Sequence, residues 1–263
     1  MTITGGEAAA GEYVTVQGRQ VWHETHGSGG EPVVLLHGGF AGASSWAAQT
    51  PALVRAGFRV YVPERRGHGH TPDVEGPFTY DVMADETISY LDAVVGEPAH
   101  LVGWSDGAVV AVLVAMRRPD LLRRMVVVGQ YYNSAGRVLD SSLDRLIRGP
   151  EGIEFLRRAY DPISPDGPEH FDVVYSKMLE MIDSEPEIEL TELNGIRAPT
   201  LVVQGDRDEV TLDHSAAVVA AIPGGRLAVL PGSHVVPIEL PDVMNALLVT
   251  FLRDGAPPPL SPT

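Results

Sequence analysis

Short hydrophobic runs alternate with longer amphipathic segments along most of the chain. The runs are rich in β-branched residues and are bounded by Gly, Pro or Asp, which is typical of buried strands. The segments between them have the length and pattern of helices. Such alternation predicts an α/β fold, a mostly parallel sheet with helices on both faces. The expected strands are 13–16, 20–24, 33–36, 58–62, 99–102, 125–129, 200–204 and 227–230, with the first two antiparallel around Gly18.

The expected helices follow the strands until the middle of the chain, where the alternation stops. Residues 133–196 contain helical stretches but no hydrophobic run that predicts a strand. This segment therefore stands apart from the sheet. The helices expected in the alternating part are 44–56, 80–95, 106–117, 213–221 and 241–253, and those in the middle segment are 143–147, 151–160 and 171–182.

A GWSDG motif at 103–107 lies between an expected strand and an expected helix. In that setting a G-x-S-x-G pattern is typical of a nucleophile elbow, where a tight turn exposes a serine hydroxyl at the edge of the sheet. The structural alternative is an ordinary serine that caps the helix. With the companion motifs described below, we expect Ser105 to be a catalytic nucleophile.

A serine nucleophile needs a histidine base and an acid that holds the base, in the chain order Ser, Asp or Glu, His. Strand 200–204 ends at a GDRD turn, and strand 227–230 leads to His234. Because ligands bind outside the carboxyl ends of parallel strands, these groups should converge on Ser105. The residues alone leave Asp206 and Asp208 as candidates for the acid.

Acyl transfer also needs two backbone N–H groups aimed at the oxyanion. One is expected from Asp106, directly after the nucleophile. The other is expected from the HGGF loop at 37–40, where glycine permits a close approach to a ligand, and Gly39 is the expected donor. Phe40 and Trp104 adjoin these two loops, and we expect both to contact the substrate.

Five motifs occur in a fixed order along the chain, and together they resemble the α/β-hydrolase superfamily. They are HGGF at 37–40, RGHG at 66–69, GWSDG at 103–107, GDRD at 205–208 and H-x-x-x-x-E-x-P at 234–241. The resemblance extends over roughly residues 11–254, except for the middle segment. It implies the α/β-hydrolase fold in its serine-nucleophile branch.

The resemblance also implies how the chain is divided. It implies a core domain in two parts, 1–132 and 197–254, and a helical cap at 133–196 that covers the active site. The proline-rich end, 255–263, is expected to be flexible.

In the resembling family the catalytic acid stands three residues after the glycine of the GDRD turn, which implies Asp208. Asp206 is then expected to bond to the backbone of its own turn.

The acid beside the nucleophile has two interpretations. As the first residue of a helix, Asp106 complements the helix dipole. The GWSDG elbow is also similar to that of valacyclovir-hydrolase-type enzymes, which cleave amino-acid esters. This resemblance implies that the Asp106 carboxylate binds the amino group of the substrate. A carboxylate beside an oxyanion hole opposes the developing charge unless a positive group screens it, and a substrate amine would do so.

Charge and composition exclude several classes of function. The 263-residue chain has a formal net charge of −16, which argues against nucleic acid and anionic membranes as partners. It contains no cysteine, which excludes disulfides, a thiolate nucleophile and cysteine-ligated metal. No apolar stretch has the length of a membrane span, and the first residues lack the pattern of a signal peptide. We expect a cytoplasmic protein with a small-molecule substrate.

The segment 161–195 contains ten acidic residues and a single basic one, Lys177. It is either a solvated face or a field that attracts cationic substrates. His68 and His70 form an H-x-H pair, but no third ligand follows at a metal-site spacing, so we expect them to stabilise a loop. His37 is expected to be structural. No metal or cofactor is expected.

These observations predict a serine hydrolase that cleaves an ester, thioester, lactone or activated amide through an acyl-enzyme. Serine at 105 disfavours the branches of the fold that attack through a carboxylate, the dehalogenases and epoxide hydrolases. The same fold hosts C–C lyases, cofactor-free oxygenases and receptors that signal through the cap, and these remain alternatives.

Overall fold

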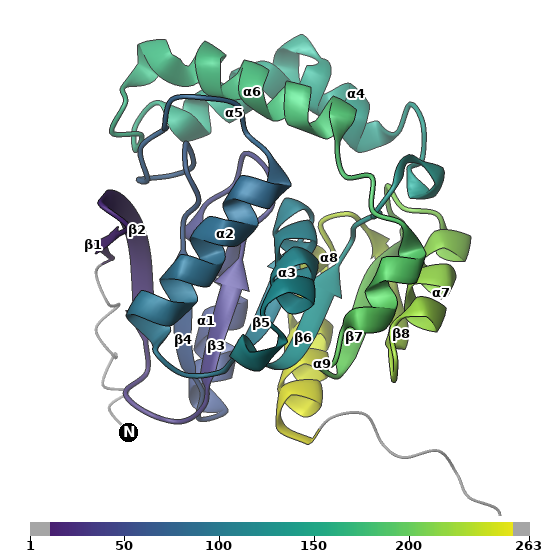
Figure 1. The fold of residues 1–263 in the computed structure, drawn as a ribbon. Helices are drawn as coiled ribbons and strands as arrows, with labels where there is room; N and C mark the ends of the chain where they lie inside the picture. Colours follow the sequence, from purple (N-terminus) through teal and green to yellow (C-terminus); the bar gives the residue numbers. More distant parts are fainter. Residues whose placement is uncertain (1–10, 255–263) are drawn as a thin grey trace, which may run out of the picture.

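The computed structural model describes residues 11–254, whose strands form one eight-stranded sheet in the order β1-β2-β4-β3-β5-β6-β7-β8 (Figure 1). The six strands β3 to β8 run parallel to one another, and β2 pairs antiparallel with both β1 and β4. This confirms the predicted α/β fold. The strands are β1 (Glu12–Val16), β2 (Arg19–His26), β3 (Pro32–Leu36), β4 (Arg59–Pro63), β5 (Ala99–Trp104), β6 (Leu122–Val128), β7 (Thr200–Arg207) and β8 (Arg226–Ser233).

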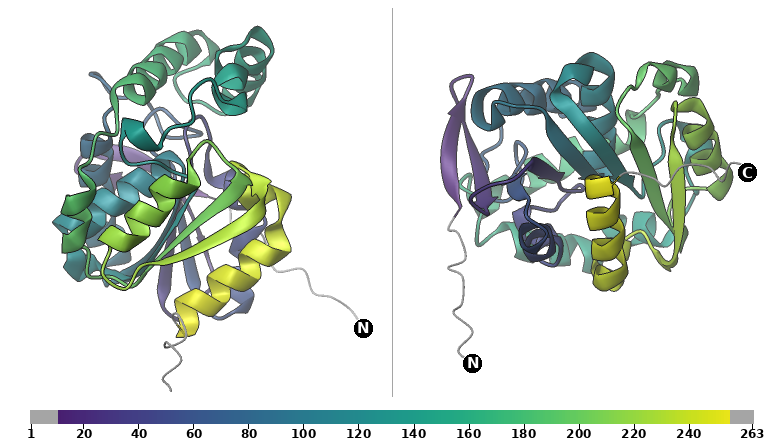
Figure 2. Two further views of the ribbon diagram at one scale, coloured as in Figure 1. Left: turned by 90° about the vertical axis from the view of Figure 1, so that its right-hand side faces the viewer. Right: turned by 90° about the horizontal axis from the view of Figure 1, so that it is seen from below.

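Helices cover both faces of the sheet. Helices α2, α3 and α7 lie on one face, and α1 and α9 lie on the other (Figures 1 and 2). Within residues 11–254, no helix is both long and apolar enough to cross a membrane. The helices of the core are α1 (Gln49–Arg55), α2 (Tyr80–Tyr90), α3 (Asp106–Arg117), α7 (Leu212–Ala221), α8 (Val236–Glu239) and α9 (Pro241–Asp254).

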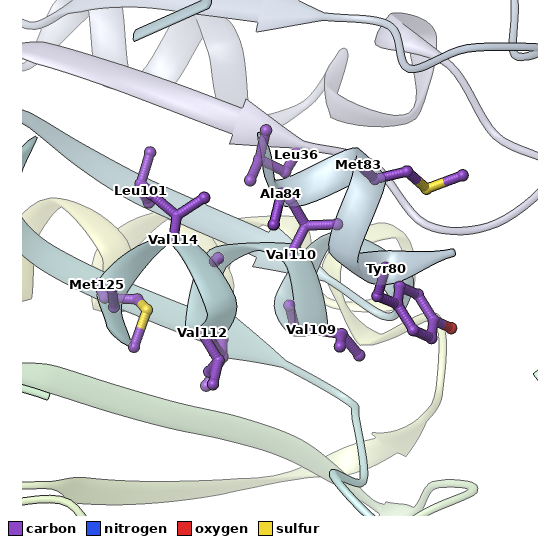
Figure 3. Packing of buried hydrophobic residues seen from close by; sticks show 14 of the residues in the cluster. Leu36, Tyr80, Met83, Ala84, Leu101, Val109, Val110, Val112, Val114 and Met125 are labelled. Atoms are coloured by element: carbon purple, nitrogen blue, oxygen red, sulfur yellow. The ribbon is translucent and has the colours of Figure 1, made fainter. Parts of the chain in front are cut away.

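The centre of the molecule is the packing of α3 against β3, β5 and β6. Every residue of β3 and β5 is buried, which explains why these strands appear in the sequence as continuous hydrophobic runs. Valines 109, 110, 112 and 114 of α3 pack with Leu36, Leu101 and Met125 of the three strands (Figure 3). This packing holds the first turn of α3, and with it the nucleophile loop, on a rigid support.

Three further helices lie above the carboxyl ends of the strands (Figure 1). They are α4 (Ser142–Arg148), α5 (Pro150–Tyr160) and α6 (Phe171–Ser184), and they coincide with the helical stretches expected in the middle segment. We keep 133–196 as the proposed cap and 1–132 and 197–254 as the proposed core. The expected flexible tail, 255–263, lies outside the described residues.

Two expected helices differ from the structure. The helix expected at 44–56 is interrupted: a 3₁₀ turn spans Ala43–Trp46, and α1 begins only at Gln49. Because Pro51 has no N–H to donate, it is tolerated in the first turn of a helix but not in the interior. The helix expected at 80–95 ends as α2 at Tyr90 and continues as a wider π turn over Leu91–Val95.

Candidate active site

Ser105 lies in the sharp turn between β5 and α3, with φ 55° and ψ −124°. A side chain at either flanking glycine would collide with backbone. An added Cβ would lie 2.2 Å from the Gly107 oxygen if placed on Gly103, and 2.2 Å from the Leu36 oxygen if placed on Gly107. The motif therefore needs glycine at both positions because the backbone packs so closely, and the serine itself takes a strained conformation.

The structure brings together the three residues expected to form a triad. His234 Nε2 lies 3.0 Å from Ser105 Oγ, and His234 Nδ1 lies 2.8 Å from Asp208 Oδ1. The Asp208 carboxylate also accepts hydrogen bonds from the backbone N–H groups of Gly205 and Glu209. With Nδ1 donating to Asp208, the lone pair of Nε2 faces the serine hydroxyl, which suits it to act as a base.

The electrostatic surroundings favour a proton on His234. Burial lowers the pKa of His234, but the hydrogen bond and charge of Asp208 outweigh it, and the charges of Glu209 and Asp106 add to that effect. The pKa of His234 is therefore raised above its ordinary value. This stabilises the imidazolium that forms when the histidine accepts a proton from serine.

The loop that carries His234 is held from two sides. Glu239 accepts hydrogen bonds from the backbone N–H (2.7 Å) and hydroxyl (2.9 Å) of Ser233. The indole N–H of Trp104 donates to the carbonyl of His234 at 2.9 Å. Trp104 thus borders the site as expected of a substrate contact, but its one polar group is already used to hold the base.

Asp206 takes no part in this arrangement. Its Oδ1 accepts a hydrogen bond from the backbone N–H of Gly232 on β8 at 3.0 Å. The expected bond within its own turn was therefore wrong. The turn stands at the end of the paired strands β7 and β8, so a neighbouring strand offers its N–H instead.

The HGGF loop runs directly against the nucleophile. An added Cβ would lie 3.2 Å from Ser105 Cβ if placed on Gly38, and 2.5 Å from Asp106 Oδ2 if placed on Gly39. His37 holds this loop, because its Nδ1 donates to the Gly38 carbonyl at 2.7 Å and its Nε2 accepts from the Arg65 backbone N–H at 3.1 Å. The backbone N–H groups of Gly39 and Asp106 remain our proposed oxyanion donors.

The Asp106 carboxylate is buried beside the nucleophile. Its Oδ1 accepts a hydrogen bond from the Tyr80 hydroxyl at 2.7 Å, while its Oδ2 has no hydrogen-bond partner among the described residues. Burial raises the pKa of Asp106, and the positive charge of Arg65 opposes this rise. One carboxylate oxygen is therefore free to bind a ligand.

Arg65 is a residue that the sequence patterns did not single out. It is buried, and its guanidinium donates to the carbonyls of His37 and Gly38 in the oxyanion loop. Burial lowers its pKa to about 10, so it keeps its charge at neutral pH. A positive group of the protein itself therefore offsets the Asp106 charge, and a substrate amine is not the only group that could do so. The position of Arg65 just after β4, at the carboxyl end of a strand, is the sequence feature that could have identified it.

Two cavities meet at Ser105, Asp106 and His234. The smaller one, called the polar cavity because most of its lining residues are polar or charged, has a volume of about 70 Å³, and the larger one is mainly apolar and has a volume of about 340 Å³. Among the residues that line only the smaller cavity are Tyr80, Gln130, Tyr131, Arg137, Asp144 and Glu209. Phe40 and Trp104, both expected to contact substrate, line the larger one together with α4 and α5.

The H-x-H pair is engaged in bonds within its own loop. His68 Nδ1 donates to the Arg66 carbonyl at 2.8 Å, and His70 Nδ1 lies 3.1 Å from Glu64 Oε2. Among residues 11–254, no group of three or more His, Asp or Glu side chains is arranged to hold a metal ion.

Comparison with known proteins places this geometry in a family. The Alpha/beta hydrolase family matches residues 33–247, which is most of the chain. The chain belongs to the alpha/beta hydrolase family. The fold and the order of the five motifs agree with this membership.

This alpha/beta hydrolase is similar to other hydrolases over nearly its full length. It is 25% identical to the serine hydrolase BPHL of Mus musculus, over 95% of this chain and 89% of the mouse protein. It is 28% identical to the putative carbamate hydrolase RutD of Caulobacter sp. strain K31, over 92% of this chain and 98% of that protein. The crystal structure of an enol-lactonase from Burkholderia xenovorans LB400 superposes with a TM-score of 0.75 at 25% identity, over 92% of this chain and 100% of that one. The similarity to BPHL confirms the expected relationship to valacyclovir-hydrolase-type enzymes.

Proposed function

We propose that this alpha/beta hydrolase is a serine hydrolase that cleaves a small-molecule ester, thioester, lactone or activated amide. The observation that carries the proposal is the pair of contacts at His234, 3.0 Å to Ser105 Oγ and 2.8 Å to Asp208 Oδ1. A nucleophile within hydrogen-bond reach of a base that a third group orients is the arrangement that covalent acyl transfer requires.

In the proposed mechanism, Ser105 Oγ attacks the substrate carbonyl while His234 Nε2 takes the serine proton. Asp208 holds the imidazolium in orientation, and the N–H groups of Gly39 and Asp106 bind the oxyanion. His234 then gives the proton to the leaving group. Water, activated by the same histidine, hydrolyses the acyl-enzyme and releases the acid.

We further propose that the substrate carries an amine close to the scissile carbonyl. The support is Asp106, which lines both cavities. Its Oδ2 atom is buried and has no hydrogen-bond partner among residues 11–254. A buried carboxylate oxygen gains most from a charged donor. Arg65 offsets part of the Asp106 charge, and the amine would add a charged donor to the carboxylate oxygen that has no partner.

Covalent labelling tests the proposed nucleophile. A fluorophosphonate probe should label the wild-type protein, and Ser105→Ala should abolish labelling. Ser105→Ala and His234→Ala should each lower turnover of a reactive ester by about 10³- to 10⁶-fold with the fold retained, because both groups act in one bond-making step. The circular dichroism spectrum of each variant checks the fold. Undiminished labelling of Ser105→Ala would contradict the assignment.

The C–C lyase, cofactor-free oxygenase and receptor alternatives share this fold, and turnover assays separate them from acyl transfer. No feature of the described residues favours one of them over acyl transfer. A receptor would bind ligand, raise its melting temperature and turn over no ester. Turnover of a simple ester with a burst equal to the enzyme concentration would exclude that alternative, because a burst reports an accumulating acyl-enzyme.

A further inference from the structure

A second, mainly apolar cavity adjoins the larger catalytic cavity and is not lined by Ser105. It has a volume of about 360 Å³ and lies between α5, the start of α6 and the core loops at 40–45 and 67–69. It does not touch the triad. The two cavities share six lining residues, which are Phe40, Ala41, Ser45, Phe155, Leu156 and Ile238. Because they share these residues, the two cavities are neighbours, and together they are called the path, which extends from Ser105 to beneath α5.

The wall of this path carries almost no charge. The titratable side chains of the larger catalytic cavity are Asp106 and His234, and both lie next to Ser105. In the second cavity the titratable side chains are His68 and Tyr160, and burial lowers the pKa of His68 to about 3, so that it is neutral at neutral pH. A ligand group deep in the path would therefore gain from burying apolar surface and would find no ion to pair with.

The rim of the path exposes large apolar side chains. Phe155 of α5 is 63% exposed, Ile238 of α8 is 57% exposed and Leu146 of α4 is 54% exposed, and each lines at least one of the two cavities. Single exposed apolar residues are ordinary, but a group that lines the same cavities marks a place where apolar matter binds.

We propose that the substrate has an extended apolar arm that runs from Ser105 through both cavities beneath α5, and a small polar remainder in the 70 Å³ polar cavity. This inference rests on the proposed serine hydrolysis and specifies its substrate class. The preferred substrates are asymmetric esters with a long alkyl or alkyl-aryl group on one side of the scissile bond. The second cavity shares six lining residues with the catalytic one, and this common wall is what selects a substrate arm as its occupant.

A chain-length series measures the arm. In one series of methyl esters the acyl chain grows from acetate to decanoate, and in a second series of acetates the alcohol grows over the same range, all below their micellar concentrations. In one of the two series, kcat/KM should rise by about twofold to fourfold per methylene, because each buried methylene contributes transfer free energy. The rise should continue beyond the length that the first cavity alone can hold.

A paired substitution tests the second cavity. Ala159 lies at an exposed position of α5 that lines the second cavity and does not line the larger catalytic cavity, so Ala159→Trp should narrow the second cavity. The neighbouring Arg158 is exposed and lines neither cavity, which makes Arg158→Trp the matched control. In the series that shows the rise, Ala159→Trp should lower the ratio of kcat/KM for the ten-carbon over the four-carbon ester by about tenfold or more, and Arg158→Trp should keep the wild-type ratio.

The outcomes separate this inference from the function on which it rests. Flat length profiles in both series, together with normal probe labelling and acetate turnover, would overturn the extended arm and leave the serine hydrolase intact. Equal ratios in Ala159→Trp and Arg158→Trp would overturn the role of the second cavity. Absence of labelling would instead overturn the proposed nucleophile.

Discussion

The nucleophile occupies a backbone conformation that serine rarely adopts. Ser105 combines a positive φ of 55° with a ψ of −124°, a region that favours glycine. The conformation is maintained because β5 and α3 pack so closely around it. The proposed nucleophile therefore costs stability, and the cost is located in the main chain rather than in the hydroxyl.

Replacing Ser105 by glycine should release that strain. Ser105→Ala and Ser105→Gly both remove the hydroxyl, so the two variants differ by one Cβ atom. We expect the free energy of unfolding of Ser105→Gly to exceed that of Ser105→Ala by about 1 kcal/mol. The melting temperature of Ser105→Gly should then be about 2 to 4 °C higher. Equal melting temperatures, or a lower one for glycine, would show that the elbow is not strained.

Asp106 should determine whether the hydrolase prefers amine-bearing substrates. An aminoacyl ester should be cleaved about tenfold to a hundredfold faster in kcat/KM than the same ester without the amine, because a charged hydrogen bond to the buried carboxylate adds binding energy. Asp106→Asn should erase this preference while largely sparing the ester that lacks the amine.

The backbone N–H at 106 survives the substitution, which separates the side chain from the oxyanion hole. Tyr80→Phe is a useful companion, because it removes the hydrogen bond to Oδ1 and leaves the carboxylate in place. If Asp106→Asn slows both substrates equally, Asp106 is only a helix-start acid. If the wild type has no amine preference, the proposed amine is wrong.

At the scale of elements, the loop that carries the proposed catalytic acid is bonded to the entry of the cap. The N–H of Val138 donates to the carbonyl of Glu209 at 2.8 Å, and the N–H of Leu143 at the start of α4 lies 3.3 Å from Glu209 Oε1. Glu209 is also the neighbour of Asp208. Glu209 therefore links the first helix of the proposed cap to the residue next to it in the chain, the proposed acid.

The charge of Glu209 should be visible in the pH profile. The base is active when neutral, and the pKa of His234 is raised by Asp208, with Glu209 adding to the rise, so kcat/KM should fall on the acid side from above pH 6.5. Glu209→Gln keeps a hydrogen-bond acceptor for Leu143 but removes the charge. The ratio of variant to wild-type kcat/KM should therefore increase as the pH falls.

Asp206→Asn provides the control for this prediction. It removes the same charge from the same loop, but its carboxylate bonds to Gly232 and is not among the groups that raise the His234 pKa. On the acid side of the pH profile, kcat/KM of Asp206→Asn should fall over the same pH range as kcat/KM of the wild type. If the two variants shift this pH range equally, the effect belongs to the net charge of the molecule and not to Glu209.

A second contact joins the cap to the core at α6. Lys177 Nζ lies 2.6 Å from Asp73 Oδ2, and His170 Nε2 lies 2.8 Å from the same oxygen. Burial raises the pKa of Asp73, but the hydrogen bonds from Lys177 and His170 outweigh it and hold the pKa below its ordinary 3.8. A carboxyl group whose pKa is lower in the folded than in the unfolded state stabilises the protein at pH values above its unfolded-state pKa. This stabilisation is lost as the pH falls through its folded-state pKa.

Asp73→Asn should therefore destabilise the protein in a pH-dependent way. The free energy of unfolding should drop by about 1 to 3 kcal/mol at pH 7, because Lys177 loses its charged partner. The difference from wild type should shrink as the pH falls below about 4, where the wild-type carboxyl also becomes neutral. Urea denaturation across this range measures it, and a difference that is the same at every pH would contradict the ion pair. Asp172→Asn, at an exposed cap ion pair, should change little at any pH.

At the scale of the whole molecule, the acidic segment 161–195 mostly serves local structure. Two of its carboxylates bond within the proposed cap: Asp183 pairs with Arg148, and Glu187 accepts from the N–H of Ser134. A third joins the cap to the core, because Glu185 accepts from the N–H of Tyr80. None of its acids lines the polar cavity. The carboxylates that do so are Asp106, Asp144 and Glu209, which lie elsewhere in the sequence.

The features that the sequence predicted are local or periodic. The buried strands, the GWSDG elbow at 103–107 and the loops after β7 and β8 follow from short patterns and from the rule that ligands bind at the carboxyl ends of strands. Arg65, Tyr80 and Glu209 were missed because their roles depend on contacts with residues distant in the chain. The same reason hides the path beneath α5, whose shape depends on side chains from the cap and the core together.

The two cavities on either side of Ser105 also govern which product forms. Where the arm belongs to the acyl half of the ester, the small alcohol half leaves the polar cavity and the arm keeps the acyl group in place. The vacated space of about 70 Å³ beside His234 accommodates water, and it accommodates a short alcohol as readily. The acyl-enzyme then partitions between nucleophiles according to their concentrations. In alcohol-rich medium the same residues would catalyse transesterification, so the solvent and not the fold decides between cleaving an ester and exchanging it.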